Sequence, residues 1–164
     1  MGVEIKSNTC NGEGAGVWVS GPTSFDNVKI LSNIGAEAIY TYSSGTGIDF
    51  DNVTIASNTG PGVRVHCCSS ESNFKDTRII DNGGVGISLG YNADITLESV
   101  TIVSNQGSIS QMYHSDNSSI SEPTFIDVNI VNNGVGFINP NNAVIMSAEN
   151  VWWGHSSGPY HVTQ

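Results

Sequence analysis

A nine-residue phrase that ends in asparagine recurs along this chain. Its copies begin at periods of 25, 24, 23 and 28 residues. They are Phe25–Asn33, Phe50–Asn58, Phe74–Asn82, Leu97–Asn105 and Phe125–Asn133. Within each copy, apolar and polar residues alternate with the period of a β-strand. A near-constant period of this length, combined with strand alternation, predicts a chain wound into stacked coils.

Each coil is predicted to contain three strands. In the second copy, Val53 and Ile55 face one side of a strand and Thr54 faces the other. A corner that contains glycine follows the terminal asparagine and leads into a second strand, as in residues 62–65. A third strand, near residues 47–50, closes the coil. The inward pair recurs as Val3 and Ile5, Val28 and Ile30, Thr77 and Ile79, Val100 and Ile102, and Val128 and Ile130.

Coils stacked at the strand spacing of about 4.8 Å would align equivalent side chains into ladders. The inward pairs would form two such ladders, and the first residues of the phrase would form another. Asparagine at the corner tolerates a left-handed backbone, and its amide can bond the same group in the coils on either side. We therefore expect an asparagine ladder made of Asn33, Asn58, Asn82, Asn105 and Asn133.

Composition supports a solenoid, because charged residues are 12% of the chain where about 25% is typical. The net charge of −10 argues against nucleic-acid partners, which require a basic surface. No run of about 18 apolar residues is present, so membrane insertion is not expected, and no signal peptide is recognisable. The three cysteines, Cys10, Cys67 and Cys68, cannot all pair and are expected to be free thiols.

The repeat with its asparagine corner resembles the right-handed parallel β-helix, or pectate-lyase-like, superfamily. The resemblance covers almost the whole chain and implies an all-β fold of about six to seven coils. It implies one domain, residues 1–164, that stands alone or belongs to a longer β-helix. The superfamily includes lyases, hydrolases, phage tailspikes and surface modules, so the resemblance is specific for fold and not for activity.

The segment Asn150–Pro159 is similar to the Trp-Trp-Gly…Ser-Gly-Pro segment that closes β-helix domains in many bacterial secreted or surface proteins. This similarity implies a secreted or cell-surface parent protein. Trp153 takes the inward position that isoleucine holds in earlier coils and would cover the last coil. Trp152 would point outward, either as a stacking platform for sugar or as a lid over the following turn.

The coil ends suggest a partner. Residues 3–8 match the second half of the phrase, and no capping segment is recognisable before or after the repeats. Open strand edges pair readily with other chains. We therefore expect a homo-oligomer that forms through the coil ends.

Stacked carboxylates are the candidate catalytic groups. Asp26 and Asp51 occupy equivalent positions, with Glu98 and Glu149 in the same register and Lys75 between them. The spacing of adjacent coils suits a retaining glycosidase pair or a calcium site. The alternative is structural, because Asp-Asn before a strand commonly forms turns.

Other chemical groups are weaker candidates. A lyase mechanism like that of the superfamily would need an arginine base near calcium, for which Arg64 is the candidate. His155 and His161 have no cysteine or carboxylate at ligand spacing beside them, so no metal site is assigned to them. A Cys67 nucleophile with His66 is disfavoured because adjacent strand residues point to opposite faces.

The second strand of each coil offers a candidate carbohydrate-binding face. Its outward positions are expected to hold Ile39, Arg64 and Ser88, followed two residues later by Thr41, His66 and Gly90, with Trp18 in the first coil. An aromatic ring, an arginine and a histidine beside the loop 12–16 could hold a glycan. The long excursion at residues 111–119 is a second candidate wall, with Tyr113 and His114 at its tip.

Two functions remain open from the sequence. The first is a non-catalytic β-helix module of a secreted or surface protein, with carbohydrate as the candidate ligand. The second is a polysaccharide lyase or glycoside hydrolase acting on acidic polysaccharide, with calcium as its candidate cofactor.

Overall fold

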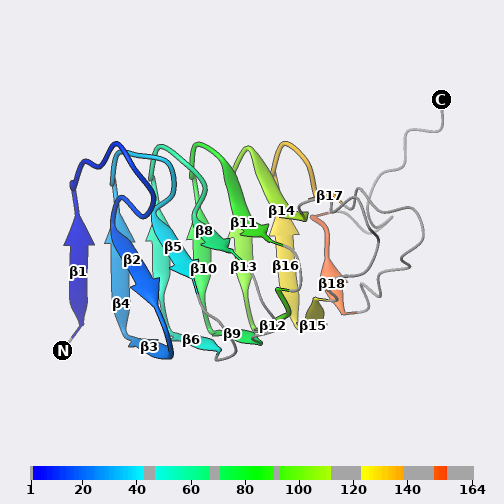
Figure 1. Ribbon diagram of the computed structural model, residues 1–164. Coiled ribbons are helices and arrows are strands. Elements are labelled where there is room, and N and C mark those ends of the chain that lie inside the picture. The colour runs from blue at the N-terminus through cyan, green and yellow to red at the C-terminus, as the bar shows by residue number, and fades with distance from the viewer. Residues whose placement is uncertain are drawn as a thin grey trace, which may run out of the picture.

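The computed structural model describes residues 2–42, 47–66, 71–90, 93–111, 123–138 and 150–154. The regular elements in these residues are all β-strands, which pair in parallel and stack side by side from one end of the molecule to the other (Figure 1). Successive strands join three different sheets in turn, so three strands complete one coil. Five complete coils, from β1–β3 to β13–β15, are followed by β16, β17 and β18. The predicted parallel β-solenoid with three strands per coil is confirmed.

The first sheet has seven strands within the described residues. They are β1 (Val3–Lys6), β4 (Val28–Leu31), β7 (Thr54–Ala56), β10 (Arg78–Ile80), β13 (Thr101–Val103), β16 (Val128–Val131) and β18 (Val151–Trp152). The second sheet consists of β2 (Val17–Ser20), β5 (Ile39–Tyr42), β8 (Val63–Val65), β11 (Val85–Leu89), β14 (Gly107–Gln111) and β17 (Phe137–Ile138). The third sheet consists of β3 (Thr23–Asp26), β6 (Ile48–Asp51), β9 (Ser72–Lys75), β12 (Ile95–Glu98) and β15 (Thr124–Ile126).

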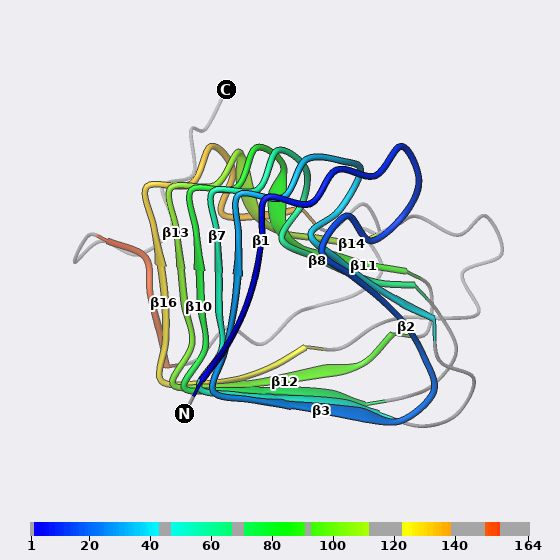
Figure 2. The same ribbon diagram turned by 90° about the vertical axis from the view of Figure 1, so that its left-hand side faces the viewer.

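Viewed along the stack, the three sheets form the three sides of each coil (Figure 2). No helix among the described residues has the length and apolar character needed to cross a membrane.

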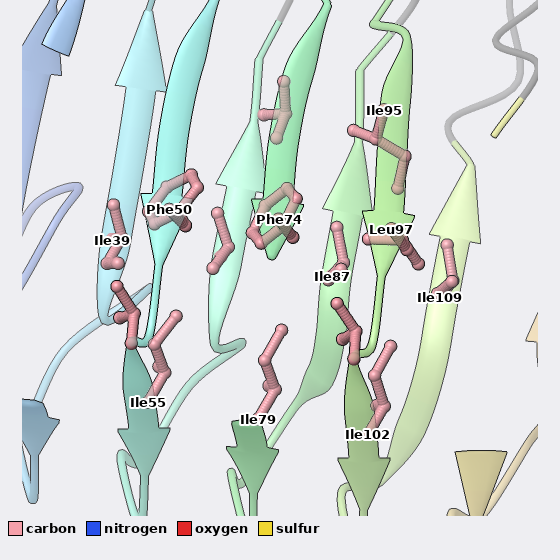
Figure 3. Close-up of a cluster of buried hydrophobic side chains, with 14 of the residues drawn as sticks. Ile39, Phe50, Ile55, Phe74, Ile79, Ile87, Ile95, Leu97, Ile102 and Ile109 are labelled. Carbon is pink, nitrogen blue, oxygen red and sulfur yellow. The ribbon is translucent and has the colours of Figure 1, made fainter. Parts of the chain in front are cut away.

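The core lies between the three sheets and consists of side-chain ladders. The rings of Phe25, Phe50 and Phe74 stack with centroid separations of 5.1 and 4.4 Å. Leu97 and Phe125 continue this column in register. Isoleucines from each sheet fill the remaining space (Figure 3), and full burial of each such side chain contributes roughly 1.5–3 kcal/mol.

The asparagine ladder is confirmed. Each amide Nδ2 donates to Oδ1 of the next ladder residue, at 3.0 Å from Asn33 to Asn58 and 2.9 Å from Asn58 to Asn82. The same Oδ1 also accepts the backbone N–H of the preceding ladder residue, and Nδ2 donates to a backbone carbonyl of the preceding coil. The ladder continues through Asn105 to Asn133 and includes Asn8 at its start.

The left-handed residue of this corner is not the ladder asparagine, contrary to the expectation from sequence. It is the residue before it, and these residues have φ between 52° and 56°: Ser7, Ser32, Ser57, Asp81, Ser104 and Asn132. Short polar side chains tolerate this conformation. The left-handed residue turns the chain so that the asparagine after it points inward and can bond both neighbouring coils.

Glycines after the ladder make room for it. A Cβ on Gly62 would lie 2.7 Å from the carbonyl oxygen of Gly86 and 2.9 Å from Cγ2 of Ile79. Added Cβ atoms at Gly16 and Gly86 would likewise approach the nearest ladder amide and isoleucine. The glycine in the corner is therefore required by the close approach of adjacent coils.

The two C-terminal tryptophans point as the repeat register predicts. Trp152 pairs with Asn129 on the outer face of the first sheet and is exposed. Trp153 is partly buried and packs against the core. The remaining residues of the expected closing segment, 155–159, lie outside the described residues.

Replacing a central ladder residue tests how much this corner stabilises the fold. Asn82→Ala removes the amide that donates to Asn105 and the oxygen that accepts from Asn58, leaving buried polar groups without partners. We expect a loss of about 3 kcal/mol in the free energy of unfolding. Chemical denaturation measures this loss.

The matched control is Asn73→Ala, which removes an exposed amide bonded to Asp49. Its effect should stay within about 0.5 kcal/mol. Equal effects of the two substitutions would contradict a stabilising role for the ladder.

Candidate functional site

The outer face of the second sheet carries a cluster of aromatic and charged side chains. Strand pairing places Trp18, Tyr40 and Arg64 in one outward row. Tyr42 and His66 follow two residues after Tyr40 and Arg64, which puts them on the same face. We call these five residues the aromatic cluster.

The register of β5 differs from the one expected from sequence. Ile39 and Thr41 point into the core and are fully buried, whereas Tyr40 and Tyr42 take the outward positions. The corner is the cause, because Tyr40 follows ladder residue Asn33 by seven positions while Arg64 follows Asn58 by six. A shift of one residue exchanges the two faces of a strand. Thr41 satisfies its buried hydroxyl by donating to the carbonyl oxygen of Arg64 at 3.2 Å.

The His66 ring lies beside both tyrosine rings of the cluster. The His66 ring centroid lies 5.4 Å from those of Tyr40 and Tyr42. Tyr42 is 46% exposed and Trp18 is 54% exposed, whereas Tyr40 is only 4% exposed. The cluster therefore has a buried ring at its centre and two half-exposed rings at its margin.

Arg64 is held from two sides. Its Nη1 lies 3.1 Å from Oε1 of Glu37, and its Cζ lies 5.8 Å from the centroid of the Tyr40 ring. Glu37 is 5% exposed, so the ion pair is largely removed from water. A pair in this setting gains from both the opposite charge and the aromatic face.

The connection between β1 and β2 runs alongside the backbone of residues 37–38. Ala15 donates its N–H to the carbonyl of Glu37 at 2.6 Å, and Gly16 donates to Ala38 at 2.9 Å. The loop also brings Glu13 close enough to Tyr40 to influence its hydroxyl group. Burial is the largest cause that raises the pKa of Tyr40, and the negative charge of Glu13 raises it further while Arg64 opposes the rise.

Glu37 and His66 each bury one polar atom without a hydrogen-bond partner within the described part of the chain. The two atoms are Oε2 of Glu37 and Nδ1 of His66. Both atoms are shielded from solvent, so neither is displayed on the surface of the aromatic cluster.

The candidate catalytic residues lie on different sheets. Asp26 and Asp51 pair in register at the ends of β3 and β6, as expected, and both are exposed. Lys75 follows in the same row and lies 3.5 Å from Glu98. Arg64, by contrast, belongs to the second sheet. Catalytic roles for these residues, and a calcium site, stay predictions.

Each of the two aspartates precedes a left-handed corner residue. Asn27 has φ 54° and Asn52 has φ 53°, and Nδ2 of Asn27 donates to Asp26. This geometry matches the structural alternative for the Asp-Asn pairs, in which they form the turn between the third and first sheets.

Other residues singled out from sequence lie apart from the cluster or outside the described residues. Trp152 stands on the first sheet. A groove of about 330 Å³ lies at the opposite end of the same sheet, and none of the candidate residues lines it. Its lining consists of Gly2, Val3, Glu4, Asn27, Lys29, Asn52 and Thr54. The candidates outside the described residues are Cys67, Cys68, Tyr113, His114, Glu149, His155 and His161.

Sequence reasoning missed four members of this region. Tyr40 and Tyr42 were hidden by the longer corner, whose extra residue is visible in the spacing from Asn33. Glu13 and Glu37 lie in connections rather than strands, and no repeat position marks them. Only the fold shows that they converge on Tyr40 and Arg64.

A comparison with protein families now identifies the fold. The family model described as "Right handed beta helix region" matches residues 10–160. The chain belongs to the right-handed β-helix family. No curated protein and no solved structure gives a match to this chain. For a right-handed β-helix, function depends on the side chains displayed on its sheets rather than on the fold.

The alkaline stability of this β-helix tests the setting of Tyr40. Its pKa lies above the ordinary value of 10.0 in the folded state, so the folded protein keeps a proton that the unfolded chain has lost. The resulting stabilisation is complete below about pH 10 and is lost as the pH rises through the folded-state pKa.

Tyr40→Phe removes this titration. Its free energy of unfolding should therefore decline less than that of the unsubstituted protein between about pH 9 and about pH 11. Denaturation at a series of pH values measures the difference. Parallel declines in the two proteins would show that Tyr40 is not held neutral by its surroundings.

Proposed function

We propose that this chain is a non-catalytic β-helix module that binds carbohydrate through the aromatic cluster. The observation that carries the proposal is the pair of half-exposed rings, Trp18 and Tyr42, on one flat sheet face. Exposed aromatic faces stack well on the apolar faces of sugar rings, and their polar edges bond the hydroxyl groups.

The strands that carry the aromatic cluster are held firmly by the core beneath them. Strands β2, β5 and β8 are adjacent parallel strands, and their inward residues Val19, Ile39 and Val63 are buried in the core. Side chains displayed from packed strands lose little freedom on binding, which favours affinity. Two serines that follow Arg64 in the same outward row, Ser88 and Ser110, add hydroxyl groups to this face.

The same geometry favours binding over cleavage. A glycosidase or lyase must place its acid, base or nucleophile around one scissile bond. Asp26 and Asp51 project from the third sheet, whereas Arg64 and the aromatic rings belong to the second sheet. Action on acidic polysaccharide remains the alternative function, to be decided by assay.

The proposal also includes the setting and assembly of the module. A secreted or cell-surface parent protein is supported by the similarity of the segment Asn150–Pro159 to closing segments of such proteins. Self-association through coil edges is supported by β1, which is an edge strand of the first sheet and in which Val3 is 57% exposed. Open strand edges favour pairing with a second copy.

Two tryptophan variants test the carbohydrate site. Trp18→Ala removes a ring that is 54% exposed on the second sheet, and Trp152→Ala removes one that is 51% exposed on the first sheet. In a glycan-binding assay, Trp18→Ala should weaken binding by about tenfold or more, since loss of a stacking ring costs roughly 0.5–1.5 kcal/mol beyond the area it buries. Trp152→Ala should leave binding unchanged.

Loss of binding in Trp152→Ala alone would move the site to the first sheet and contradict the proposal. The same polysaccharides, incubated with the protein with and without calcium, should remain intact. Depolymerisation that disappears in Asp51→Ala or Arg64→Ala would establish the enzymatic alternative instead.

Sedimentation at increasing protein concentration tests self-association. In β1, Val3 and Ser7 donate their N–H groups to the second coil, so the alternating residues Glu4 and Lys6 direct theirs to the open edge. Glu4→Pro removes one of these open donors and should shift the protein toward monomer. A clean monomer of the unsubstituted chain at high concentration would refute the proposed assembly.

A further inference from the structure

Basic residues are distributed unevenly over the three sheets. The chain has five lysines and arginines. Lys6, Lys29 and Arg78 lie in the first sheet, and Lys75 lies in the third. Arg64 is therefore the one basic residue in the strands of the second sheet, where the aromatic cluster lies.

The charge of Arg64 is already balanced by a protein carboxylate. Its guanidinium lies 3.1 Å from Glu37, whose side chain is 6% exposed against 26% for Arg64. A buried carboxylate depends on its cation, so a carboxylate from a ligand would have to compete with Glu37 for the same group. Glu13 adds a second carboxylate at the exposed margin of the cluster. The region therefore holds two carboxylates and one guanidinium.

Tyr40, at the centre of the cluster, indicates the sign of the local potential. After burial, Glu13 is the next cause that raises its pKa, and Glu37 also raises it, while Arg64 lowers it. Both carboxylates thus oppose a negative charge at this position. Trp18 lies one strand away from Tyr40, about 4.8 Å, and Tyr42 lies two residues further along the same strand, about 7 Å. An acidic sugar stacked on either ring would therefore lie within the screening length of about 8 Å at physiological salt.

We infer that the aromatic cluster takes a glycan without carboxylate or sulfate groups. Stacking on Trp18 and Tyr42 supplies the affinity, and the excess of two carboxylates, Glu13 and Glu37, over the one guanidinium of Arg64 disfavours acidic polysaccharides. The inference rests on the proposed carbohydrate-binding function and names the class of ligand for that site. The charge preference can be tested separately from carbohydrate binding, because a glycan-binding face can also bind acidic polysaccharides.

Paired glycans with the same backbone and different charge test this inference. Oligogalacturonate is compared with its full methyl ester, and neutral gluco-, xylo- and manno-oligosaccharides are compared with their carboxymethyl derivatives. Titration calorimetry at low salt should show the uncharged member of a pair binding about fivefold tighter or more. Added salt should reduce the difference, because screening weakens the repulsion.

Each outcome has one meaning. Preference for uncharged members supports the inference. Equal or tighter binding of the acidic members overturns it and leaves the proposed carbohydrate-binding function intact. Failure of every glycan to bind overturns the proposed function, and the inference with it.

A charge-neutral substitution at the margin gives a second readout. Glu13→Gln removes one exposed carboxylate but keeps an oxygen that can accept from Tyr40. It should raise affinity for the acidic member of a pair by about threefold and leave the uncharged member unchanged. Asp49→Asn, which removes an equal charge from an exposed position on β6 in the third sheet, should alter neither. Equal responses of the two variants would show that Glu13 does not set the charge preference.

Discussion

Everything in this molecule depends on adjacent coils keeping the same register. Parallel strand pairing fixes that register on all three sides, and the asparagine ladder fixes it again at one corner. Because each ladder amide bonds the coils on both sides, a slip of one coil would leave buried donors and acceptors unpaired. The corner therefore specifies the alignment of the core as well as stabilising it.

The surface follows from the same constraint. A row of outward residues on one sheet is a row of equivalent repeat positions, so side chains far apart in sequence come to lie side by side, as Trp18, Tyr40 and Arg64 do. Small differences in corner length change which residues face outward. The extra residue after Asn33 places Tyr40 and Tyr42 on the outer face of the sheet and points Ile39 and Thr41 into the core. A binding face can thus arise without any change in the core.

The fold was predictable because each repeat encodes its own coil. The ladder positions and the inward column from Phe25 to Phe125 can be identified directly from the spacing of residues in the sequence. The candidate site was only partly predictable. Trp18, Arg64 and His66 were recognised as outward residues, but Tyr40 and Tyr42 were displaced by a corner one residue longer. Glu13 and Glu37 reach the cluster from connections whose paths the repeat does not determine. The left-handed residue of the corner was misplaced by one position, since asparagine and serine both tolerate that conformation.

Spin-label distances along one outward row test the register most directly. Ser24, Asp49, Asn73 and Thr96 are successive partners on the third sheet. With one nitroxide at Ser24 and the second at each of the others in turn, the mean separation should grow by about 4.8 Å per coil, although the labelled residues move more than twenty positions apart in sequence at each step. Separations that do not grow in these equal, small steps would contradict the stacked register on which the core, the ladder and the aromatic cluster all depend.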